Sequence, residues 1–203
     1  MKLPGRTIER LSEYRRTLLV CLDENKSFIY SHDLAARLHI TAVQVRRDLM
    51  LIGHSSVLRK GYDIRELIHT ISKVIDTDEV VNVAVIGIGN LGRAVASYFK
   101  GKRSKLNLVA SFDNDPQKVN KVISGIKCYP YSEAEKFIKE LDISVVILTV
   151  PPEFARETAE EIVRFGIKGI LNLTTISLNV PQGVHLEEYD MITSIEKLVY
   201  FVK

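Results

Sequence analysis

A glycine-rich segment directly after a strand-like run is the feature that most restricts the fold of this chain. Residues 81–86 are mostly β-branched and apolar, which is the pattern of a buried strand. The segment Gly87-Ile88-Gly89-Asn90-Leu91-Gly92 follows it and matches G-x-G-x-x-G, and a helix-like stretch continues to residue 99. Strand, glycine turn and helix in this order predict a dinucleotide-binding Rossmann unit built on a parallel sheet.

Each glycine of the motif has a physical role in this interpretation. The first permits a tight turn, the second lets the backbone approach a pyrophosphate, and the third lets the helix pack on the sheet. The helix N-terminus then offers free N–H groups and a partial positive charge to the phosphates. The structural alternative is a tight strand–helix turn that binds nothing. The candidate cofactor-binding residues of this loop are Gly87, Ile88, Gly89, Asn90, Leu91 and Gly92.

An acidic residue ends the next predicted strand, residues 106–112. Asp113 lies 21 residues after Gly92, close to the spacing at which a carboxylate accepts hydrogen bonds from the adenosine ribose hydroxyls. The same carboxylate would repel a ribose 2′-phosphate. The predicted cofactors are therefore NADH and NAD⁺ rather than their phosphorylated relatives.

The rest of the C-terminal half alternates strands with helices. Strands are expected at residues 145–150, 169–172 and 184–186. One helix is expected at residues 153–165, and another runs to Leu141 after a capping-box pattern that starts at Ser132. A third, short helix is expected to open at Asp115-Pro116. This alternation predicts a parallel sheet covered on both faces. Ligands bind at the carboxyl ends of such strands. The strand ends therefore add four candidates near the nicotinamide, namely Thr149, Val150, Pro151 and Asn172. The alternative is that both segments are ordinary exits from a strand into a loop.

The first eighty residues have helical rather than strand periodicity. Four helices are expected, at about residues 8–22, 33–38, 41–52 and 65–75, with turn residues from 54 to 62. Ser31 is the candidate N-cap of the second helix. Thr41 and Gln44 form a capping-box pattern at the start of the third helix, and Gly53 ends it.

The third helix has the pattern of a DNA-recognition helix. With Val45 at the centre of the buried face, Arg47 and Val43 point away, and Gln44 and Arg46 lie on the flanks. In the major groove arginine pairs with guanine and glutamine with adenine. The alternative is a solvated helix face. Residues 59–62 follow as a β-wing, so the half reads as a winged helix-turn-helix. The candidate DNA-binding residues are Ser31, Thr41, Gln44, Arg46, Arg47, Arg59, Lys60, Gly61 and Tyr62.

The charge distribution agrees with a polyanion partner for the first half. Residues 1–60 hold eleven Lys and Arg against six Asp and Glu, a net charge of +5, whereas residues 80–203 hold fifteen against fourteen. We expect a winged-helix domain at 1–79, a Rossmann domain at 80–188 and a C-terminal dimerisation helix at 189–203.

Location and redox state follow from what the chain contains. The longest apolar runs are far shorter than the ~18–20 residues that span a bilayer, and the first eleven residues do not resemble a secretory signal. Cys21 and Cys128 are too few for a disulfide framework and fit no metal-ligand spacing. The prediction is a cytoplasmic protein with no metal site and no membrane partner.

Catalytic machinery is not evident in the sequence. Four of the five histidines fall in the helical half, away from the glycine loop. Tyr98 and Lys102 match a Tyr-x-x-x-Lys spacing, but they come only nine residues after Gly89, too early for a dehydrogenase acid. A nicotinamide enzyme usually needs such a proton donor beside the hydride acceptor, so the chain is not expected to be an enzyme.

Taken together, these motifs resemble the Rex family of redox-sensing transcriptional repressors over nearly the whole chain. The resemblance rests on Arg15-Arg16, Asp33-Leu34-Ala35, Thr41 to Leu49, Lys60-Gly61-Tyr62, Gly87 to Gly92, Phe112 to Pro116, Thr149-Val150-Pro151 and Gly166 to Asn172. The chain departs from the usual family pattern at residues 51–61 and at Leu173-Thr174-Thr175.

This resemblance implies a homodimer that binds palindromic double-stranded operator DNA and is released by NADH. It also implies that the C-terminal helix, about residues 190–202, is swapped onto the partner's Rossmann domain, and that Arg16, Tyr98 and Asp190 form a switch. An apolar stripe of Ile192, Ile195, Leu198 and Val202 suits burial on another surface. The simpler alternative is packing on the chain's own sheet.

Three other functions are also compatible with the sequence. One is a small NAD-dependent oxidoreductase with a helical appendage, and another is a module that binds coenzyme A or a further nucleotide. The third is a DNA-binding protein whose Rossmann half no longer binds a ligand. If the chain is a repressor, selectivity must come from the nicotinamide ring, which is cationic in NAD⁺ and neutral in NADH, so an apolar pocket would favour NADH.

Overall fold

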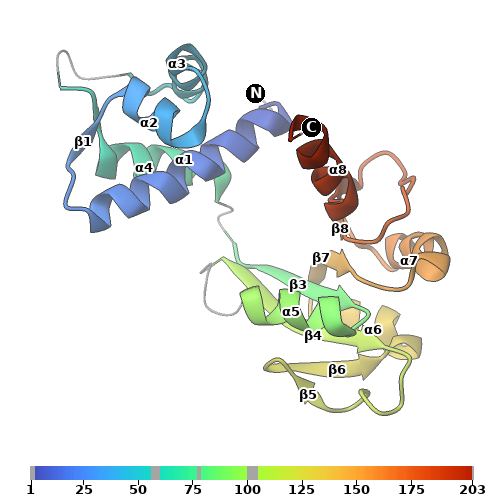
Figure 1. Cartoon of the computed structure of the whole chain (residues 1–203). Coiled ribbons are helices and arrows are strands. Elements are labelled where there is room, and N and C mark those ends of the chain that lie inside the picture. The colour runs from blue at the N-terminus through green and yellow to red at the C-terminus, as the bar shows by residue number, and fades with distance from the viewer. Residues whose placement is uncertain (1–2, 56–59, 77–78, 100–104, 203) are drawn as a thin grey trace. The chain divides into compact units, whose positions relative to one another are not determined.

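The chain forms two compact units, Met1–Asp78 and Glu79–Lys203. The computed structural model describes residues 3–55, 60–76, 79–99 and 105–202 (Figure 1). The further division of the second unit into a Rossmann part and a C-terminal helix stays a prediction.

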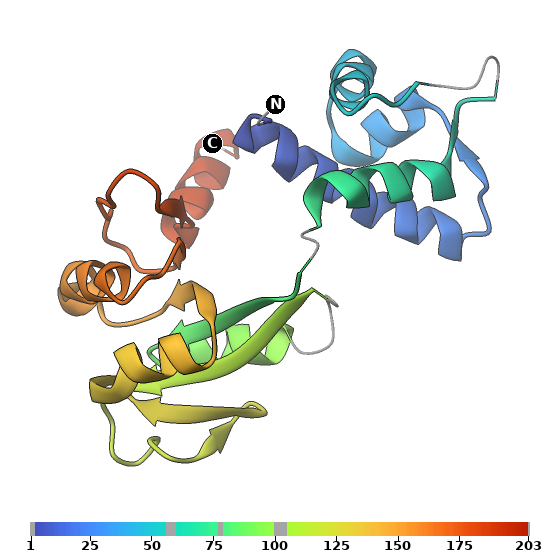
Figure 2. The same cartoon turned by 180° about the vertical axis from the view of Figure 1, so that it is seen from behind.

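The first unit is a winged helix-turn-helix. Its elements are α1 (Gly5–Asp23), β1 (Phe28–Ile29), α2 (Ser31–Leu38), α3 (Ala42–Leu51), β2 (Tyr62–Asp63) and α4 (Ile64–Ile75). Helices α1 and α4 run side by side (Figures 1 and 2), and β1 pairs antiparallel with β2. The apolar faces of all four helices meet in one core that includes Leu11, Leu18, Leu34, Val45 and Leu67.

Local signals explain where these elements begin and end. The hydroxyl of Thr41 accepts a hydrogen bond from Gln44 N at 3.1 Å and so caps α3. Gly53 follows α3 at φ +73°, as a left-handed residue after a helix should. At Gly61 (φ +80°) a Cβ atom would lie 2.6 Å from Ile29 O, so the close approach of the β1–β2 ribbon requires glycine.

The second unit is a Rossmann fold around a seven-stranded sheet with the order β5-β6-β4-β3-β7-β8-β9. Among its described pairings, only that of β5 with β6 is antiparallel. The strands are β3 (Val81–Ile86), β4 (Leu106–Asp113), β5 (Val122–Ile123), β6 (Ile126–Pro130), β7 (Ile143–Leu148), β8 (Gly169–Asn172) and β9 (His185–Glu188). The helices are α5 (Asn90–Phe99), α6 (Ala134–Glu140), α7 (Pro152–Arg164) and α8 (Met191–Phe201), with a 3-10 turn η1 (Tyr131–Glu133). From β6 to β9 this is the doubly wound order of dinucleotide-binding sheets, with the switch point beside β3.

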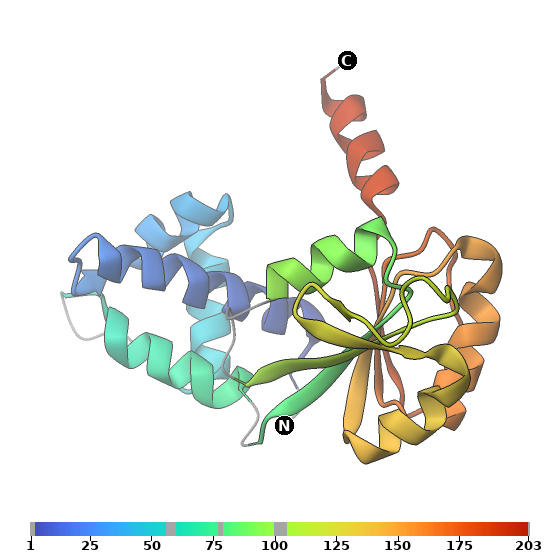
Figure 3. The same ribbon diagram turned by 90° about the horizontal axis from the view of Figure 1, so that it is seen from below.

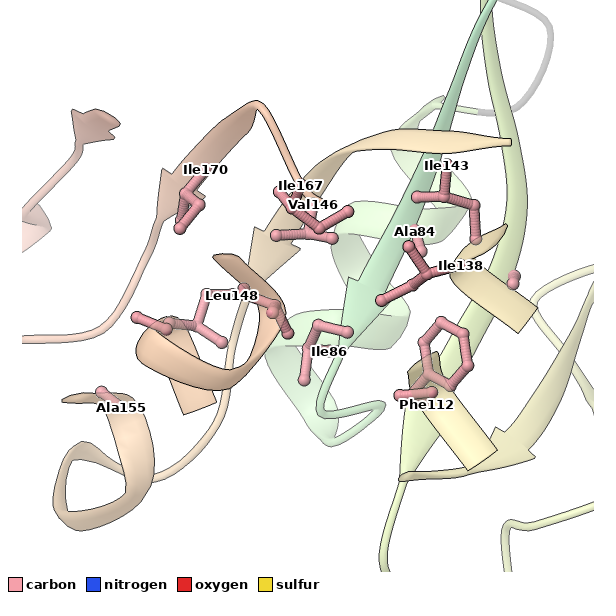
Figure 4. Packing of buried hydrophobic residues seen from close by; sticks show 14 of the residues in the cluster. Ala84, Ile86, Phe112, Ile138, Ile143, Val146, Leu148, Ala155, Ile167 and Ile170 are labelled. Atoms are coloured by element: carbon pink, nitrogen blue, oxygen red, sulfur yellow. The ribbon is translucent and has the colours of Figure 1, made fainter. Parts of the chain in front are cut away.

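Alternation along the strands builds two cores, one on each face of the sheet. Ala84 and Ile86 of β3 pack with α6 and α7 (Figure 4), whereas Val83 and Val85 pack with Ala96 of α5. Helix α5 therefore covers one face and α6 with α7 the other, which Figure 3 shows from below. The fold class predicted from the sequence, a winged helix followed by a parallel Rossmann sheet, is confirmed.

Several local predictions were wrong or incomplete. Asp115-Pro116 opens a series of turns rather than a helix, because the Asp115 carboxylate accepts from Gln117 N and closes an Asx turn. The Ser132 capping box does not form, since η1 precedes α6. Ser31 is the first residue of α2 and not its N-cap. Strands β5 and β6 were not predicted.

Helix α8 projects from the second unit without packing on its sheet (Figure 3). None of its residues is buried, and Ile192, Ile195, Leu198 and Val202 are 56–81% exposed. The structure thus excludes, for this chain on its own, the simpler alternative in which the apolar stripe covers its own sheet. Within the described residues, no helix is long and apolar enough to cross a membrane.

Candidate functional site

A pocket of about 790 Å³ opens at the carboxyl ends of β3, β4 and β7. Its lining combines the glycine loop, the end of β4 and one face of α7. The lining residues are Ile86, Gly87, Gly89, Asn90, Leu91, Phe112, Asp113, Asn114, Lys118, Tyr131, Thr149, Val150, Pro151, Phe154, Glu157, Thr158 and Glu161. The pocket therefore lies where doubly wound sheets bind dinucleotides.

The three glycines of the loop differ in what surrounds them. Internal structure requires glycine at two of the positions. Gly87 has a left-handed backbone (φ +89°), and a Cβ at Gly92 would lie 2.3 Å from Gly87 O. The Thr149 hydroxyl donates to Gly87 O at 2.6 Å and fixes the turn to the end of β7. At Gly89, apart from the two neighbouring residues in the chain, no described residue has an atom within 4 Å of the position that a Cβ would take. Internal packing therefore does not require a glycine at position 89. The missing side chain instead leaves room in the pocket beside it.

The start of α5 faces the same space. Helix α5 begins at Asn90, and the first amides of a helix have no carbonyl of their own helix to donate to. Together with the helix dipole these amides favour an anion such as a phosphate. Asn90 and Leu91 both line the pocket.

Asp113 is held by three donors at the edge of the pocket. Its Oδ2 accepts from Ile88 N at 2.9 Å and from Lys118 Nζ at 3.1 Å, and its Oδ1 accepts from Asp115 N at 2.9 Å. Ile88 itself is fully buried and contributes its amide rather than its side chain. The carboxylate thus ties the glycine loop to the end of β4 and stays partly exposed to the pocket.

The wall formed by α7 and η1 was not predicted from the sequence. Tyr131 donates its hydroxyl hydrogen to Glu161 Oε2 at 2.7 Å. Burial, together with this bond, raises the pKa of Tyr131, so the phenol stays protonated at neutral pH. Phe154 adds an apolar surface and Thr158 a hydroxyl to the same wall. The only sequence signal for this wall was the amphipathic period of the α7 segment, which does not identify the face that meets a ligand.

Asn172 does not line this pocket. Its amide donates to Ile176 O at 2.7 Å and to Glu188 Oε1 at 3.1 Å, and its Oδ1 accepts from Thr174 Oγ1 at 2.7 Å. The side chain is 1% exposed. In this structure Asn172 therefore organises the loop after β8.

A buried acid joins the predicted recognition helix to α1. Asp48 of α3 is 1% exposed and accepts from Arg10 Nε at 2.6 Å, Arg10 Nη2 at 2.8 Å, Tyr14 OH at 2.7 Å and Gln44 Nε2 at 2.9 Å. Burial alone would raise the pKa of Asp48, but the bonds from Arg10 and Tyr14 outweigh it and lower the pKa. The carboxylate stays charged and fixes how α3 lies on α1.

The exposed face of α3 carries the side chains expected there. Val45 and Leu49 are fully buried, whereas Val43 is 58% exposed and Arg46 and Arg47 are also exposed. Arg46 Nη1 donates to Ser31 Oγ at 3.1 Å and so links α3 to α2. The apolar rear and basic front predicted from the helical wheel are therefore present.

The wing candidates separate into different environments. Lys60 is exposed, and Gly61 is buried against β1. Tyr62 is 6% exposed and packs in the core of the first unit, 5.8 Å from the His54 ring. Arg59 lies outside the described residues. Gly61 and Tyr62 thus have structural roles in the first unit, in the pairing of β1 with β2 and in the core.

The three predicted switch residues are distributed over both units. Arg16 is exposed on α1, and Tyr98 is 63% exposed on α5. Asp190 is the N-cap of α8, where it accepts from Ile192 N at 2.9 Å and from Thr193 Oγ1 at 2.7 Å. The hydroxyl of Thr193 and the Ile192 amide lower the pKa of Asp190.

Comparisons with known proteins match both units. The family described as "CoA binding domain" matches residues 78–176, and that described as "Putative DNA-binding protein N-terminus" matches residues 2–49. The redox-sensing transcriptional repressor Rex of Limosilactobacillus reuteri is 36% identical over 202 residues, covering 100% of this chain and 94% of the relative. Rex of Lactobacillus gasseri is 34% identical with the same coverage. The chain belongs to the Rex family.

Solved structures of a Rex-family repressor agree with this assignment over the whole chain. The crystal structure of RSP in complex with beta-NAD⁺ and operator DNA matches with a TM-score of 0.91 and 33% identity, covering 100% of this chain and 93% of that one. RSP in complex with beta-NADH matches with a TM-score of 0.88, 32% identity and coverages of 100% and 95%. The protein is thus a redox-sensing, DNA-binding transcriptional repressor and not an enzyme, as the sequence predicted.

Proposed function

We propose that the pocket at β3, β4 and β7 binds NADH and NAD⁺, that α3 and the wing bind operator DNA, and that NADH releases the DNA from a homodimer. The observation that carries this proposal is the full-length match to RSP, whose structures hold beta-NAD⁺ with operator DNA, or beta-NADH. The proposed cofactor residues are Gly87 to Gly92, Asp113, Thr149, Val150, Pro151 and Asn172. The proposed DNA-binding residues are Ser31, Thr41, Gln44, Arg46, Arg47, Arg59, Lys60, Gly61 and Tyr62.

The pocket's own geometry supports a dinucleotide. The pyrophosphate fits against Gly89 and the first amides of α5, where the backbone is open and partly positive. The adenosine ribose then reaches Asp113, whose Oδ1 keeps room for a further donor. Asn172 is the weakest member of the cofactor set, because its polar atoms are already bonded inside the protein.

Redox sensing requires that the two forms of the cofactor favour different arrangements of the protein. NADH and NAD⁺ share phosphates, riboses and adenine, so the glycine loop and Asp113 cannot distinguish them. The nicotinamide ring must do so. A ligand changes an equilibrium only by its difference in affinity for the two states, and about 1.4 kcal/mol of difference shifts it tenfold.

The first unit supports major-groove binding by α3. Arg47 faces outward, and the Gln44 amide nitrogen donates to Asp48 at 2.9 Å, which leaves its carbonyl oxygen to accept from a donor group on a base. Tyr62 contributes through the core rather than by an exposed side chain. Two copies would present two such helices to half-sites about one helical turn apart.

Helix α8 supports the homodimer. Its apolar residues are exposed along the whole helix, including Leu198 at 66% and Phe201 at 73%, and a surface of this kind is typical of a protein–protein interface. We propose that α8 is swapped onto the Rossmann unit of the partner subunit, and that the dimer acts in the cytoplasm, where an operator is accessible.

The proposal is tested by fluorescence anisotropy on a palindromic AT-rich duplex. Salt is kept fixed, because phosphate contacts make DNA affinity steeply salt-dependent, and NADH and NAD⁺ are titrated separately. We expect NADH to release the DNA and NAD⁺ to leave it bound. Equal DNA binding with both nucleotides would contradict the proposal. Displacement of NADH by coenzyme A in the same pocket would instead favour the second candidate, which the CoA-binding family match raises.

Replacement of Asp190 tests the proposed switch with Arg16 and Tyr98. Asp190→Ala removes both the charge and the α8 cap, and a lost cap costs about 1 kcal/mol. Asp190→Asn keeps the cap, because Asn is as good an N-cap as Asp, but it removes the charge that Arg16 would pair with. We expect both variants to alter NADH-driven release in the anisotropy assay. A wild-type response of Asp190→Asn would assign the effect of alanine to the cap and reject the switch.

A further inference from the structure

The adenosine end of the pocket contains a lysine that the sequence pattern did not single out. Lys118 Nζ lies 3.1 Å from Asp113 Oδ2 and 3.5 Å from Asp115 Oδ2. Its side chain lines the pocket and is 23% exposed. The turn that follows β4 holds it there, with Lys118 N donating to Asp115 O at 2.9 Å.

The acceptor positions of Asp113 are nearly used up by the protein itself. A carboxylate has about four such positions. Ile88 N and Lys118 Nζ take the two on Oδ2, and Asp115 N takes one on Oδ1. A ribose that donates both of its hydroxyls needs two positions. It therefore has to displace Lys118 to bind in this bidentate way.

A displaced Lys118 stays beside the ribose. Asp115 is its second partner, and the Gln117 amide and Lys118 lower the pKa of Asp115, which keeps it charged. Together, these two carboxylates and the Lys118 ammonium carry one net negative charge, where the carboxylates alone would carry two. The ammonium thus stays at the adenosine end of the pocket, beside Asp113 and Asp115.

Resting on the nucleotide site proposed above, we infer that Lys118 lets the pocket accept an adenosine ribose that carries a phosphomonoester, and that it sets how strongly NADH is preferred over NADPH. The ammonium forms a charge-assisted hydrogen bond with the phosphate, which is stronger than a bond to a neutral hydroxyl. Asp113 still favours the unphosphorylated ribose. The two side chains together fix the ratio of the two affinities.

The test compares dissociation constants for NADH and NADPH in the full-length wild type and in Lys118→Met, measured by nicotinamide fluorescence and by calorimetry. We expect the preference for NADH to grow about tenfold in Lys118→Met, with NADH affinity itself within about threefold of wild type. Lys118→Arg keeps the charge and should keep the wild-type ratio. Lys121→Met is the matched control, since Lys121 is an exposed lysine three residues away that does not line the pocket.

Coenzyme A, which has a 3′-phosphate on the same ribose, forms a second arm. A loss confined to NADPH assigns the contact to a 2′-phosphate and supports the inference, whereas a loss confined to coenzyme A assigns it to a 3′-phosphate and overturns the inferred role in the choice between NADH and NADPH. An unchanged ratio, an equal loss for NADH and NADPH, or a wild type to which neither phosphorylated ligand binds at millimolar concentration would overturn it. If NADH itself does not bind the wild type, the proposed function is rejected as well.

Discussion

Asp48→Ala should lower the stability of the first unit by about 3 kcal/mol, a large effect for one exchange in a unit of this size. The reason is the set of donors that Asp48 satisfies. Alanine would leave the Tyr14 hydroxyl, in a fully buried side chain, without its acceptor, and Arg10 without its bidentate partner. Breaking a partly buried ion pair from one side costs more than the pair contributes when the remaining charge is poorly solvated, and Arg10 is only 23% exposed.

Urea denaturation followed by circular dichroism measures this effect, with the transition of the first unit read separately from that of the second. Asp48→Asn should lose less than alanine, because the Asn oxygen still accepts from Tyr14. Glu13→Ala, an exposed change on the same α1, should stay within about 0.5 kcal/mol of wild type. Operator affinity should also fall in Asp48→Ala at urea concentrations below its unfolding midpoint, where the protein is still folded, because α3 loses its anchor to α1. Equal stability of Asp48→Ala and Glu13→Ala would contradict the proposed anchoring.

The difference in stability between wild type and Asp48→Asn should depend on pH, and the direction follows from the pKa of Asp48. Because the folded-state pKa of Asp48 is lowered, its contribution is fully present above the unfolded value of about 3.9 and is lost as pH falls toward the folded value. The stability gap between wild type and Asp48→Asn should therefore shrink below about pH 4.

The sequence predicts this fold well where a feature depends on local periodicity or on a single backbone requirement. The helical period of the first half and the β-branched run before Gly87 each depend on near neighbours, and both predictions were correct. Strand β6 was missed because Ile126 is the only β-branched residue among its five. Its pairing with β4 is a contact that no local pattern encodes.

The candidate sites show the same division. The glycine loop and Asp113 follow from a spacing and meet in one pocket. Asp48 was not singled out from the sequence, because its partners Tyr14 and Arg10 lie 34 and 38 residues away on α1. Lys118 was missed for a different reason. An Asx turn replaced the helix expected at Asp115, and this turn brings the lysine back onto Asp113.

The second large effect is expected at two glycines of one motif, which should fail in opposite ways when changed to alanine. Gly92→Ala places a Cβ 2.3 Å from Gly87 O and 3.0 Å from Thr149 Oγ1. Backbone has to move, so we expect a loss of about 3 kcal/mol of stability. At Gly89 there is open space, and its φ is outside the left-handed region. Gly89→Ala should fold as stably as wild type or slightly better.

Gly89→Ala should leave stability unchanged but should weaken nucleotide binding. Its Cβ would occupy the space through which the pyrophosphate approaches the start of α5, so we expect NADH affinity to fall at least tenfold, about 1.4 kcal/mol, in a fully folded protein. Thermal denaturation and NADH fluorescence titration on both variants measure the two quantities side by side. Wild-type NADH affinity in Gly89→Ala would show that the pyrophosphate does not pass this backbone. Wild-type stability in Gly92→Ala would show that the contact with Gly87 relaxes at little cost, because the first turn of α5 can shift away from β3.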